Sequence, residues 1–316
     1  MFVDRRFLVT GATGFIGATL TRRLVREGAE VHVLVRASSD LWRLEGMLDS
    51  IQLHQVDLRD ADRLRDAVAQ IKPTIIYHCA AFGGYPDQTD AELMLETNLR
   101  GTLNLLRALT DHPYECLVNT GSSSEYGLKT APMREDDRLE PVSFYGVTKV
   151  SATLACQATA RATGRPIVTL RPFSPFGPYE EPTRLIPTVI MSCLLEKDPE
   201  LTSGDQVRDF IFVEDVVDCF LRLAETRLPP GEIINVGGGR QHTVREVVER
   251  IIALCGASVS PKWGTIPKRP HEATTWVADI SKAKTLLHWQ PSTNLDEGLQ
   301  KTIAWFKEHM SLYASA

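Results

Sequence analysis

The sequence predicts an α/β protein with a doubly wound parallel sheet and a smaller C-terminal lobe, and three observations lead to this prediction. Up to residue 170, short β-rich runs alternate with amphipathic stretches of helical length. Such alternation implies right-handed βαβ units and a parallel sheet covered by helices on both faces. A glycine-rich turn separates the first β-rich run from the first helix. The length of 316 residues allows one large domain or two coupled ones.

The expected elements follow one another in regular order. Strands are expected at 7–10, 31–35, 51–56, 74–78, 116–119 and 167–170, and helices at 15–27, 60–70, 91–109 and 144–163. Five prolines between 171 and 187 predict a loop that shapes a pocket. The α/β pattern then resumes with a strand at 211–213, a helix at 216–226, a strand at 232–236 and a helix at 244–256. We therefore expect a core domain of residues 1–170 with 211–237 returning to it, and a lobe of residues 171–210 and 238–316.

Composition and charge exclude several classes of protein. With 35 basic and 40 acidic residues the formal net charge is −5, so a general attraction to nucleic-acid phosphates is not expected. No apolar run approaches the roughly 20 residues that span a bilayer, and the run at 7–9 is too short for a signal peptide. We therefore expect a cytoplasmic protein without a nucleic-acid or membrane partner. The six cysteines include no CxxC pair, which indicates reduced thiols and no metal site.

The glycine-rich turn reads GATGFIG and lies between the first expected strand and the first expected helix. Glycines allow a tight turn, let the backbone approach a pyrophosphate and let the helix pack closely on the sheet. The helix N-terminus adds free N–H groups and the positive end of a dipole. We predict a bound dinucleotide, held by Gly11, Gly14, Phe15, Ile16 and Gly17.

The residue that ends the second strand bears on which dinucleotide is bound. NAD sites usually place an acidic side chain there for the ribose 2′-hydroxyl, whereas this chain has Arg36 followed by Ala37 and two serines. A guanidinium can bind a 2′-phosphate through two hydrogen bonds, which favours NADP(H) over NAD. An arginine that stacks on adenine would be compatible with either cofactor. Asp57, after the third strand, could bind the adenine amino group or simply cap the helix that follows.

Tyr145 and Lys149 are four residues apart at the start of an expected helix, so both lie on one of its faces. The pKa of a free phenol is about 10, and an ammonium together with a cationic nicotinamide lowers it, which suits proton transfer with a sugar hydroxyl. Serines 122–124 follow a strand whose C-terminal end is where ligands bind in such folds. A serine hydroxyl there can polarise the same oxygen. The combination indicates a hydride-transfer enzyme.

These segments resemble the extended short-chain dehydrogenases/reductases, and in particular their nucleotide-sugar epimerase/dehydratase branch. The resemblance extends over nearly the whole chain and implies a Rossmann fold. Its further segments are Asp57-Leu58, His78-Cys79-Ala80-Ala81, Asn98 to Thr102, Ser122 to Gly127, Arg171 to Gly177, Leu185 to Pro187, Arg208 to Asp215, Asn235 to Gly237, Ala278-Asp279 and Trp289 to Pro291.

Residue by residue, the resemblance implies the composition of the site. Ser122, Tyr145 and Lys149 would be the catalytic set, with Ser122 chosen by its spacing from Tyr126 and Gly127. Leu58, Ala80, Ala81 and Asn98 would join Tyr145 and Lys149 in holding the cofactor. Ser123, Ser124, Ser174, Arg208 and Arg269 would bind a nucleoside-diphosphate sugar. Ser174 stands where asparagine is usual, and either arginine would serve equally well in a surface ion pair.

The reaction itself is left between several alternatives. Dehydration needs an acid-base pair after the catalytic serine, where this chain has Ser123 and Ser124, with Glu125 one residue late unless a bulge brings it inward. A 4-ketoreductase that consumes NADPH is placed narrowly ahead of a 4-epimerase that retains its NAD(P), because Arg36 favours NADPH. A dinucleotide-binding protein without chemistry is the remaining alternative, and the Tyr-Lys pair argues against it.

The resemblance also implies a homodimer in which helices 91–109 and 144–163 pair with those of a second copy. Small and apolar residues on the second helix suit such close packing. Burial within one subunit would explain them equally well. These residues are Ala152, Leu154, Ala155, Ala158 and Thr159.

Overall fold

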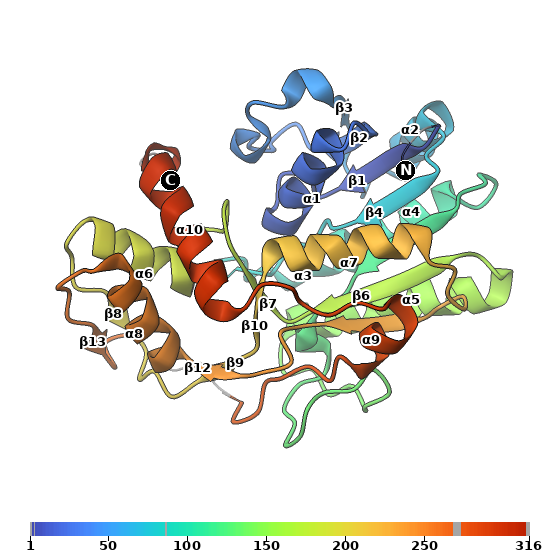
Figure 1. Ribbon diagram of the computed structural model, residues 1–316. Helices are drawn as coiled ribbons and strands as arrows, with labels where there is room; N and C mark the ends of the chain where they lie inside the picture. The colour runs from blue at the N-terminus through green and yellow to red at the C-terminus, as the bar shows by residue number, and fades with distance from the viewer. Residues whose placement is uncertain (1, 3, 86, 268–272, 314–316) are drawn as a thin grey trace.

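A computed structural model describes residues 2, 4–85, 87–267 and 273–313 of the chain. Seven parallel strands form the central sheet in the order β11-β6-β5-β4-β1-β2-β3 (Figure 1). The winding direction reverses between β1 and β4, and ligands of doubly wound folds bind at the C-terminal ends of the strands beside such a reversal. The strands are β1 (Arg6–Thr10), β2 (Glu30–Val35), β3 (Gln52–Gln55), β4 (Ile75–His78), β5 (Cys116–Thr120), β6 (Ile167–Pro172) and β11 (Ile233–Val236).

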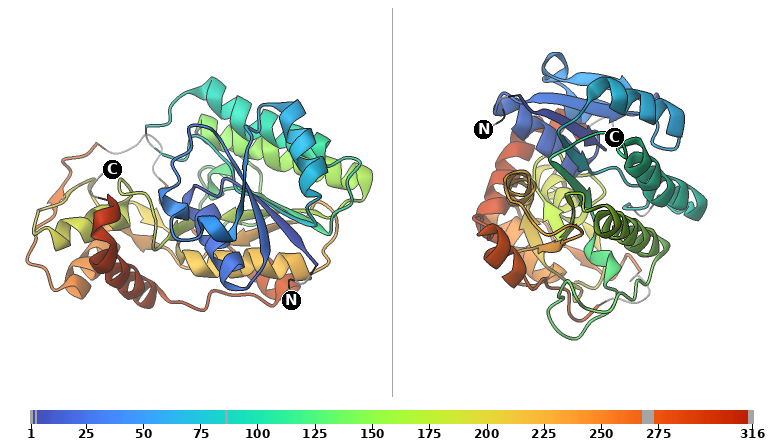
Figure 2. Two further views of the ribbon diagram at one scale, coloured as in Figure 1. Left: turned by 90° about the horizontal axis from the view of Figure 1, so that it is seen from above. Right: turned by 90° about the vertical axis from the view of Figure 1, so that its right-hand side faces the viewer.

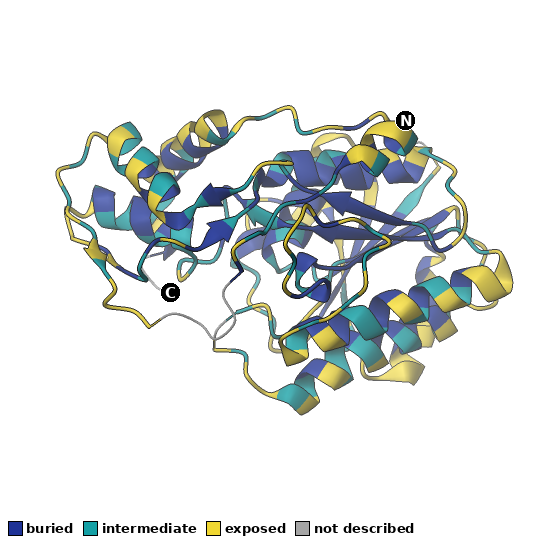
Figure 3. Ribbon diagram, turned by 90° about the horizontal axis from the view of Figure 1, so that it is seen from below, coloured by how far each residue is buried: buried dark blue, intermediate teal, exposed yellow. Residues whose placement is uncertain are grey.

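Helices cover both faces of this sheet, as the alternation of the sequence requires. Two hydrophobic clusters, one on each face, hold the helices to the strands. The strands and the helix sides that face them are formed by buried residues, and exposed residues lie on the outer sides of the helices (Figure 3). One face carries α1 (Phe15–Arg26), α7 (Val213–Glu225) and α9 (Ser281–Leu287), and the other carries α2 (Ala61–Ile71), α4 (Gly101–Ala108) and α5 (Phe144–Thr163).

The C-terminal lobe lies at one side of the sheet domain (Figure 2). Its own hydrophobic cluster joins three helices and the last turn of the described chain. Short two-stranded pairings connect the lobe to the segments that leave the sheet. The lobe contains α6 (Leu185–Leu194), α8 (Val244–Cys255), α10 (Leu295–His309) and the 3₁₀ turn η5 (Met310–Tyr313), and the short strands are β7 (Ser174–Phe176), β8 (Glu200–Leu201), β9 (Val207–Arg208), β10 (Phe210–Phe212), β12 (His242–Thr243) and β13 (Lys262–Trp263).

Three sequence expectations need correction. The helix expected at 91–109 consists of α3 (Ala91–Met94), a π-helical segment η3 (Leu95–Arg100) and α4. The loop expected to reach residue 187 ends earlier, because α6 begins at Leu185 and accommodates Pro187 in its first turn, where a missing N–H costs no hydrogen bond. The strand expected at 211–213 is β10, which pairs with β7 and not with the central sheet.

Part of the chain assigned to the lobe packs on the core domain. Residues Ala283, Leu287 and Trp289, in and just after α9, belong to the same hydrophobic cluster as α1 and α7. The C-terminal portion of the chain therefore crosses from the lobe to the sheet domain and returns through α10 to the lobe.

The structure also shows the state of the cysteines and the character of the helices. All six cysteines are free thiols, and four of them are buried. Among the described residues, no group of histidine, cysteine and acidic side chains is arranged to hold a metal ion. The helices of the described chain are too short or too polar to cross a membrane.

Candidate functional site

The glycine-rich loop connects β1 to α1 at the centre of the sheet. Gly11 has φ of +69°, and a Cβ on it would lie 2.5 Å from the backbone nitrogen of Ala80. A Cβ on Gly17 would lie 2.2 Å from the carbonyl oxygen of Gly11, so both positions require glycine. A Cβ on Gly14 would meet only the Gly11 carbonyl oxygen, at 3.3 Å. No side chain caps α1 at Gly14, which leaves the first turn of the helix free to bind a diphosphate.

The loop geometry also accounts for the other predicted neighbours of the cofactor. Ala80 lies beside Gly11, and its N–H donates to Thr10 Oγ1 at 3.3 Å, so the chain after β4 borders the glycine-rich loop. Ala81 is exposed, next to this junction. Phe15 is buried and Ile16 is half-buried in the first turn of α1. These residues fit a dinucleotide whose diphosphate lies at the N-terminus of α1.

The residues expected at the adenosine end lie close together. Arg36 is exposed after β2, and its positive charge helps to lower the pKa of Asp57, for which the main cause is the hydrogen bond from Arg59. Asp57 does not cap α2, because that role belongs to Asp60, whose side chain accepts from Arg63 N at 3.1 Å. Leu58 is buried, with its Cβ 3.1 Å from the position that a Cβ on Gly101 would take.

Tyr145, Lys149 and Ser122 lie together at the C-terminal end of β5. Ser143 caps α5 by accepting from Gly146 N at 3.1 Å, and this fixes the first turn, which carries Tyr145. The Tyr145 phenol lies close enough to the Ser122 hydroxyl for that side chain to lower the pKa of the phenol. One turn further along α5, Lys149 is buried and its Nζ donates to the carbonyl oxygen of Thr120 at the end of β5.

The electrostatics of this group depend mainly on burial. Burial raises the pKa of the Tyr145 phenol to about 12, while the Ser122 side chain acts in the opposite direction. Burial lowers the pKa of the Lys149 ammonium, and Glu125 partly offsets that effect. The phenol is therefore protonated at neutral pH before a ligand binds. A phenol in that state can donate a proton to a ketone oxygen, and it becomes a base only when added positive charge lowers its pKa.

Glu125 lies behind Ser122, and its carboxylate is bonded within the protein. Its side chain is fully buried, and its Oε2 accepts from Arg171 Nε at 2.9 Å. Its Oε1 accepts from Ser122 N at 2.8 Å and from Thr153 Oγ1 at 3.0 Å. Both carboxylate oxygens are thus used inside the protein, and the bulge that would turn Glu125 inward is not formed. Glu125 orients Ser122 and has no free oxygen for proton transfer.

Asn98 lies in the π-helical segment η3, but its amide is used within the protein. Its Nδ2 donates to Phe82 O and to Thr148 Oγ1, both at 2.8 Å, and its Oδ1 accepts from Phe82 N at 2.8 Å. Asn98 is buried. Its amide thus joins the loop after β4 to helix α5, and its predicted contact with the cofactor stays a prediction.

The predicted substrate-binding residues occupy different depths. Ser123 is buried and Ser124 is half-buried; both follow Ser122 in the 3₁₀ turn η4 (Ser123–Glu125). Ser174 is half-buried on β7, where its N–H donates to Asp209 O at 3.0 Å. The guanidinium of Arg208, on β9, lies 5.5 Å from the centre of the Trp276 ring. Arg269 lies outside the described residues.

Two further side chains near Tyr145 were not predicted. Arg184, at the N-terminus of α6, lowers the pKa of Tyr145, and Tyr85 has a smaller, opposite effect. Both come from segments without strand or helix periodicity, at the end of the proline-rich stretch and after two glycines. Only the folded chain brings them near Tyr145, so their spacing along the sequence could not predict this position.

The structure places a glycine-rich loop suited to a diphosphate and a helix with Tyr145 and Lys149 at the same edge of a parallel sheet. This arrangement is typical of dinucleotide-dependent enzymes of the short-chain dehydrogenase/reductase type. Comparison with known families gives the more specific assignment. The model of the NAD dependent epimerase/dehydratase family matches residues 7–237, and the chain belongs to this family.

Relatives with known activities and structures resemble the chain over almost its whole length. It is 30% identical to a UDP-glucuronate 4-epimerase of Thermodesulfobacterium geofontis, covering 98% of each chain. It is also 30% identical to a dTDP-4-dehydro-6-deoxy-D-allose reductase of Streptomyces bikiniensis, again covering 98% of each. The crystal structure of UDP-glucuronic acid 4-epimerase from Bacillus cereus, in complex with UDP-glucuronic acid and NAD, is 28% identical with a TM-score of 0.86, covering 96% of this chain and 99% of that one.

Proposed function

We propose that the chain catalyses hydride transfer at C4 of a nucleoside-diphosphate sugar without eliminating water. The dinucleotide would lie along the glycine-rich loop, and the sugar nucleotide would lie between the sheet domain and the lobe. The observation that carries the proposal is that Tyr145 and Ser122 lie close together while the Glu125 carboxylate is bonded to Arg171. Within the described Ser122–Glu125 turn, no acid-base side chain is therefore left to act beside Tyr145 in an elimination.

The residues of the site suggest a division of tasks. A bound nicotinamide would accept or return the hydride at C4. Tyr145 would hold or give up the proton of the O4 hydroxyl, and Ser122 would hydrogen-bond to the same oxygen and keep it in line. Lys149, bonded to Thr120 O, would supply positive charge beneath the phenol and stabilise its deprotonated form.

A 4-epimerase is our first candidate for the overall reaction, because several similar proteins carry that name. The 4-ketoreductase favoured on the sequence becomes the second candidate, supported by Arg36 and by the similar reductases. The two reactions differ in stoichiometry. An epimerase leaves the amount of reduced nicotinamide unchanged, whereas a reductase consumes one NAD(P)H for each sugar converted.

The test incubates the purified chain with UDP-glucose, UDP-glucuronate and a dTDP-4-keto-6-deoxyhexose, each with NAD⁺ and with NADPH, in water and in D₂O. We expect C4-inverted product without change in nicotinamide absorbance for an epimerase, and loss of NADPH with reduction of the ketone for a reductase. Neither product should gain deuterium on carbon from the solvent. Dehydrated product that carries solvent deuterium would contradict the proposal, and so would the absence of turnover with all three sugars.

Arg36 provides a separate prediction about the cofactor. Replacing it with aspartate removes a charge-assisted bond to a 2′-phosphate, so the Kd of NADP⁺ should rise about 10- to 100-fold. The Kd of NAD⁺ should change by less than about threefold, because NAD⁺ lacks that phosphate. Titration of each dinucleotide by calorimetry measures both values, with Arg63→Asp, an exposed arginine on α2, as the control. An equal rise in the Kd of both dinucleotides would show that Arg36 does not distinguish a 2′-phosphate from a 2′-hydroxyl.

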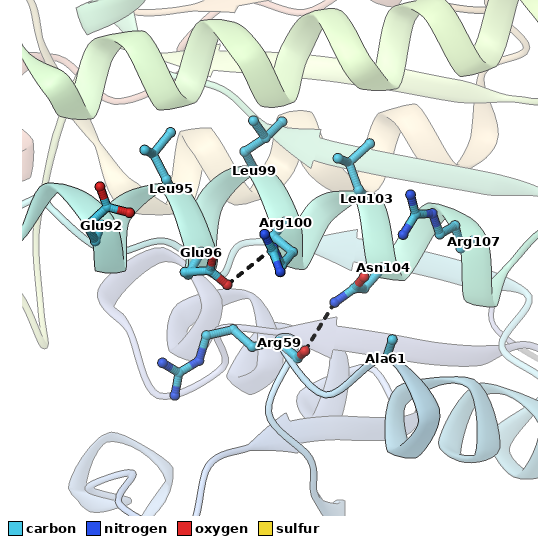
Figure 4. Close-up of a pocket in the computed structure, with 10 residues that line it drawn as sticks. All are labelled: Arg59, Ala61, Glu92, Leu95, Glu96, Leu99, Arg100, Leu103, Asn104 and Arg107. Atoms are coloured by element: carbon cyan, nitrogen blue, oxygen red, sulfur yellow. Dashed lines mark hydrogen bonds and ion pairs between the residues drawn. The ribbon is translucent and has the colours of Figure 1, made fainter.

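The proposed homodimer rests on an apolar surface shared by two adjacent helical segments. Leu95, Leu99 and Leu103 form a row along one side of the helix that contains η3 (Figure 4). They line a groove of about 670 Å³, whose other side carries charged residues that include Arg100. On the neighbouring α5, Leu154 is 49% exposed and Ala158 is exposed, although Ala152 is buried within the chain. A second copy of the same surface is the occupant we propose.

We expect the purified protein to sediment as a dimer and a Leu154→Glu variant as a monomer, because a carboxylate at this position would be buried without a partner. Leu195→Glu is the matched control, since Leu195 is 52% exposed at the end of α6, away from this surface. A parent protein that sediments as a monomer would contradict the proposed dimer surface. A dimer that persists in Leu154→Glu but is lost in Leu195→Glu would contradict it as well.

A further inference from the structure

Arg43 lies between the glycine-rich loop and the loop that leads to α6. It belongs to the 3₁₀ turn η1 (Trp42–Leu44), which follows β2, and it is only 6% exposed. Its Nε donates to Tyr179 O at 2.8 Å, and its Nη2 pairs with Glu181 Oε2 at 2.9 Å. Its Nη1 donates to Thr13 O at 3.3 Å. The guanidinium of Arg43 thus joins the glycine-rich loop to a second loop, whose residue Tyr179 follows Arg43 by 136 positions.

One end of this connection borders the predicted cofactor site, and the other end lies in the proline-rich loop that the sequence predicts to shape a pocket. Thr13 directly precedes Gly14, the N-cap of α1, where the dinucleotide diphosphate would bind. Tyr179 has φ of +68°, a backbone conformation that a tyrosine adopts only under tertiary constraint. The carbonyl oxygen that Arg43 holds belongs to this same residue. The position of one loop therefore depends on the position of the other.

The second loop continues towards the catalytic tyrosine. Glu180 is buried, with Oε1 3.7 Å from Arg184 Nε, and its Oε2 has no hydrogen-bond partner in the described part of the chain. Arg184 is close enough to Tyr145 to influence the phenol electrostatically. This loop therefore contains one carboxylate oxygen, Glu180 Oε2, that accepts no hydrogen bond within the described chain.

We propose that Arg43 is a positioning residue that couples dinucleotide binding to nucleotide-sugar binding. A ligand that orders the Thr13 loop fixes Arg43, and Arg43 then fixes Tyr179 and Glu181 in the arrangement that the second ligand requires. Because such coupling is reciprocal, each ligand raises the affinity for the other by the same factor. The inference rests on the proposed function for the identity of the two ligands.

The experiment measures that coupling factor directly. The Kd of NAD⁺ is measured with and without saturating UDP or dTDP, and the Kd of the nucleoside diphosphate is measured with and without NAD⁺. We expect the two ratios to agree, at about 5- to 150-fold in the parent protein. In Arg43→Met the ratio should fall to within about twofold of unity, because the side chain keeps its bulk but bonds neither loop.

Two further variants separate coupling from loss of structure. Arg43→Lys keeps the charge but cannot reach three acceptors with one ammonium, so its ratio should also fall, even if Arg43→Met folds poorly. Arg43 lies over the ring of Trp42, 4.2 Å from its centre, and Arg245 lies in the same way 4.1 Å from the centre of the Trp263 ring. Arg245→Met should leave the ratio unchanged. A parent ratio of one, or an unchanged ratio in both Arg43 variants, would overturn the inference. Failure of the parent to bind any of these ligands would instead refute the proposed function.

Discussion

Replacing Tyr145 with phenylalanine should lower kcat by about 10²- to 10⁴-fold, the range lost when a positioned acid or base is removed. Phenylalanine fills the same space in the first turn of α5, so the KM of the sugar nucleotide should stay within a few-fold of the parent value. The expected loss is chemical because the substitution removes only the phenolic oxygen, whose pKa Ser122 lowers. Turnover is measured with whichever nucleotide sugar the stoichiometry experiment identifies.

The pH profile distinguishes proton transfer from a structural role. In the ligand-free protein, burial raises the pKa of Tyr145 to about 12, so the phenol is protonated at neutral pH. Oxidation of an alcohol needs the deprotonated form and should speed up as pH rises, whereas reduction of a ketone needs the protonated form and should slow down above the pKa of the complex. Tyr145→Phe should lose this dependence. Tyr114→Phe, which changes a tyrosine that lies over Arg165, is the control. A Tyr145→Phe variant within about tenfold of the parent rate would refute the assignment.

The sheet domain could be predicted from the sequence because its signals are local. Helix α5 spans Phe144–Thr163, the range that the periodicity predicts, and β1, β2 and β4 differ from expectation by one residue at a boundary. The π-helical segment was not predictable in this way. It repositions Asn98 between Phe82 and Thr148, and those contacts are made only when the sheet has formed.

In the candidate site, too, the features formed by neighbouring residues could be predicted, and the contacts between distant residues could not. The residues of the glycine-rich loop are close to one another in sequence, and so are Tyr145 and Lys149. Their spacing therefore predicted the turn and the shared helix that the structure contains. The bond between Glu125 and Arg171 joins residues 46 positions apart, and that between Arg43 and Glu181 joins residues 138 apart. Charge pairs between residues so far apart in sequence depend on how the chain folds, and no local sequence pattern predicts them. The sequence could therefore name Glu125 as an alternative base but could not show that it is bonded elsewhere.

Replacing Arg171 with methionine should lower the free energy of unfolding by about 3–5 kcal/mol, the usual cost of removing one partner of a buried ion pair. Both side chains are nearly inaccessible to solvent, at 1% for Arg171 and 0% for Glu125. Methionine fills much of the space but leaves the Glu125 carboxylate without its cation. Urea unfolding measures the change. Arg138→Met, which breaks an exposed pair with Glu140, should cost less than about 1 kcal/mol.

The pH dependence of this variant tests whether an uncompensated charge is the cause. Burial already raises the pKa of Glu125, and removing Arg171 raises it further. A carboxyl group whose pKa is higher in the folded than in the unfolded state binds more protons when folded, so stability increases as pH falls through the folded-state pKa. The penalty of Arg171→Met should therefore be smaller at low pH than at neutral pH.

Adding Glu125→Gln to Arg171→Met should restore part of the lost stability at neutral pH, because a neutral amide oxygen can still accept from Ser122 N and Thr153 Oγ1. Turnover of this double variant reports on chemistry separately from stability. If Glu125 only orients Ser122, the double variant should keep measurable hydride transfer wherever it is folded. A double variant that is folded and binds both ligands, yet loses all turnover, would show that the Glu125 carboxylate takes part in the reaction itself.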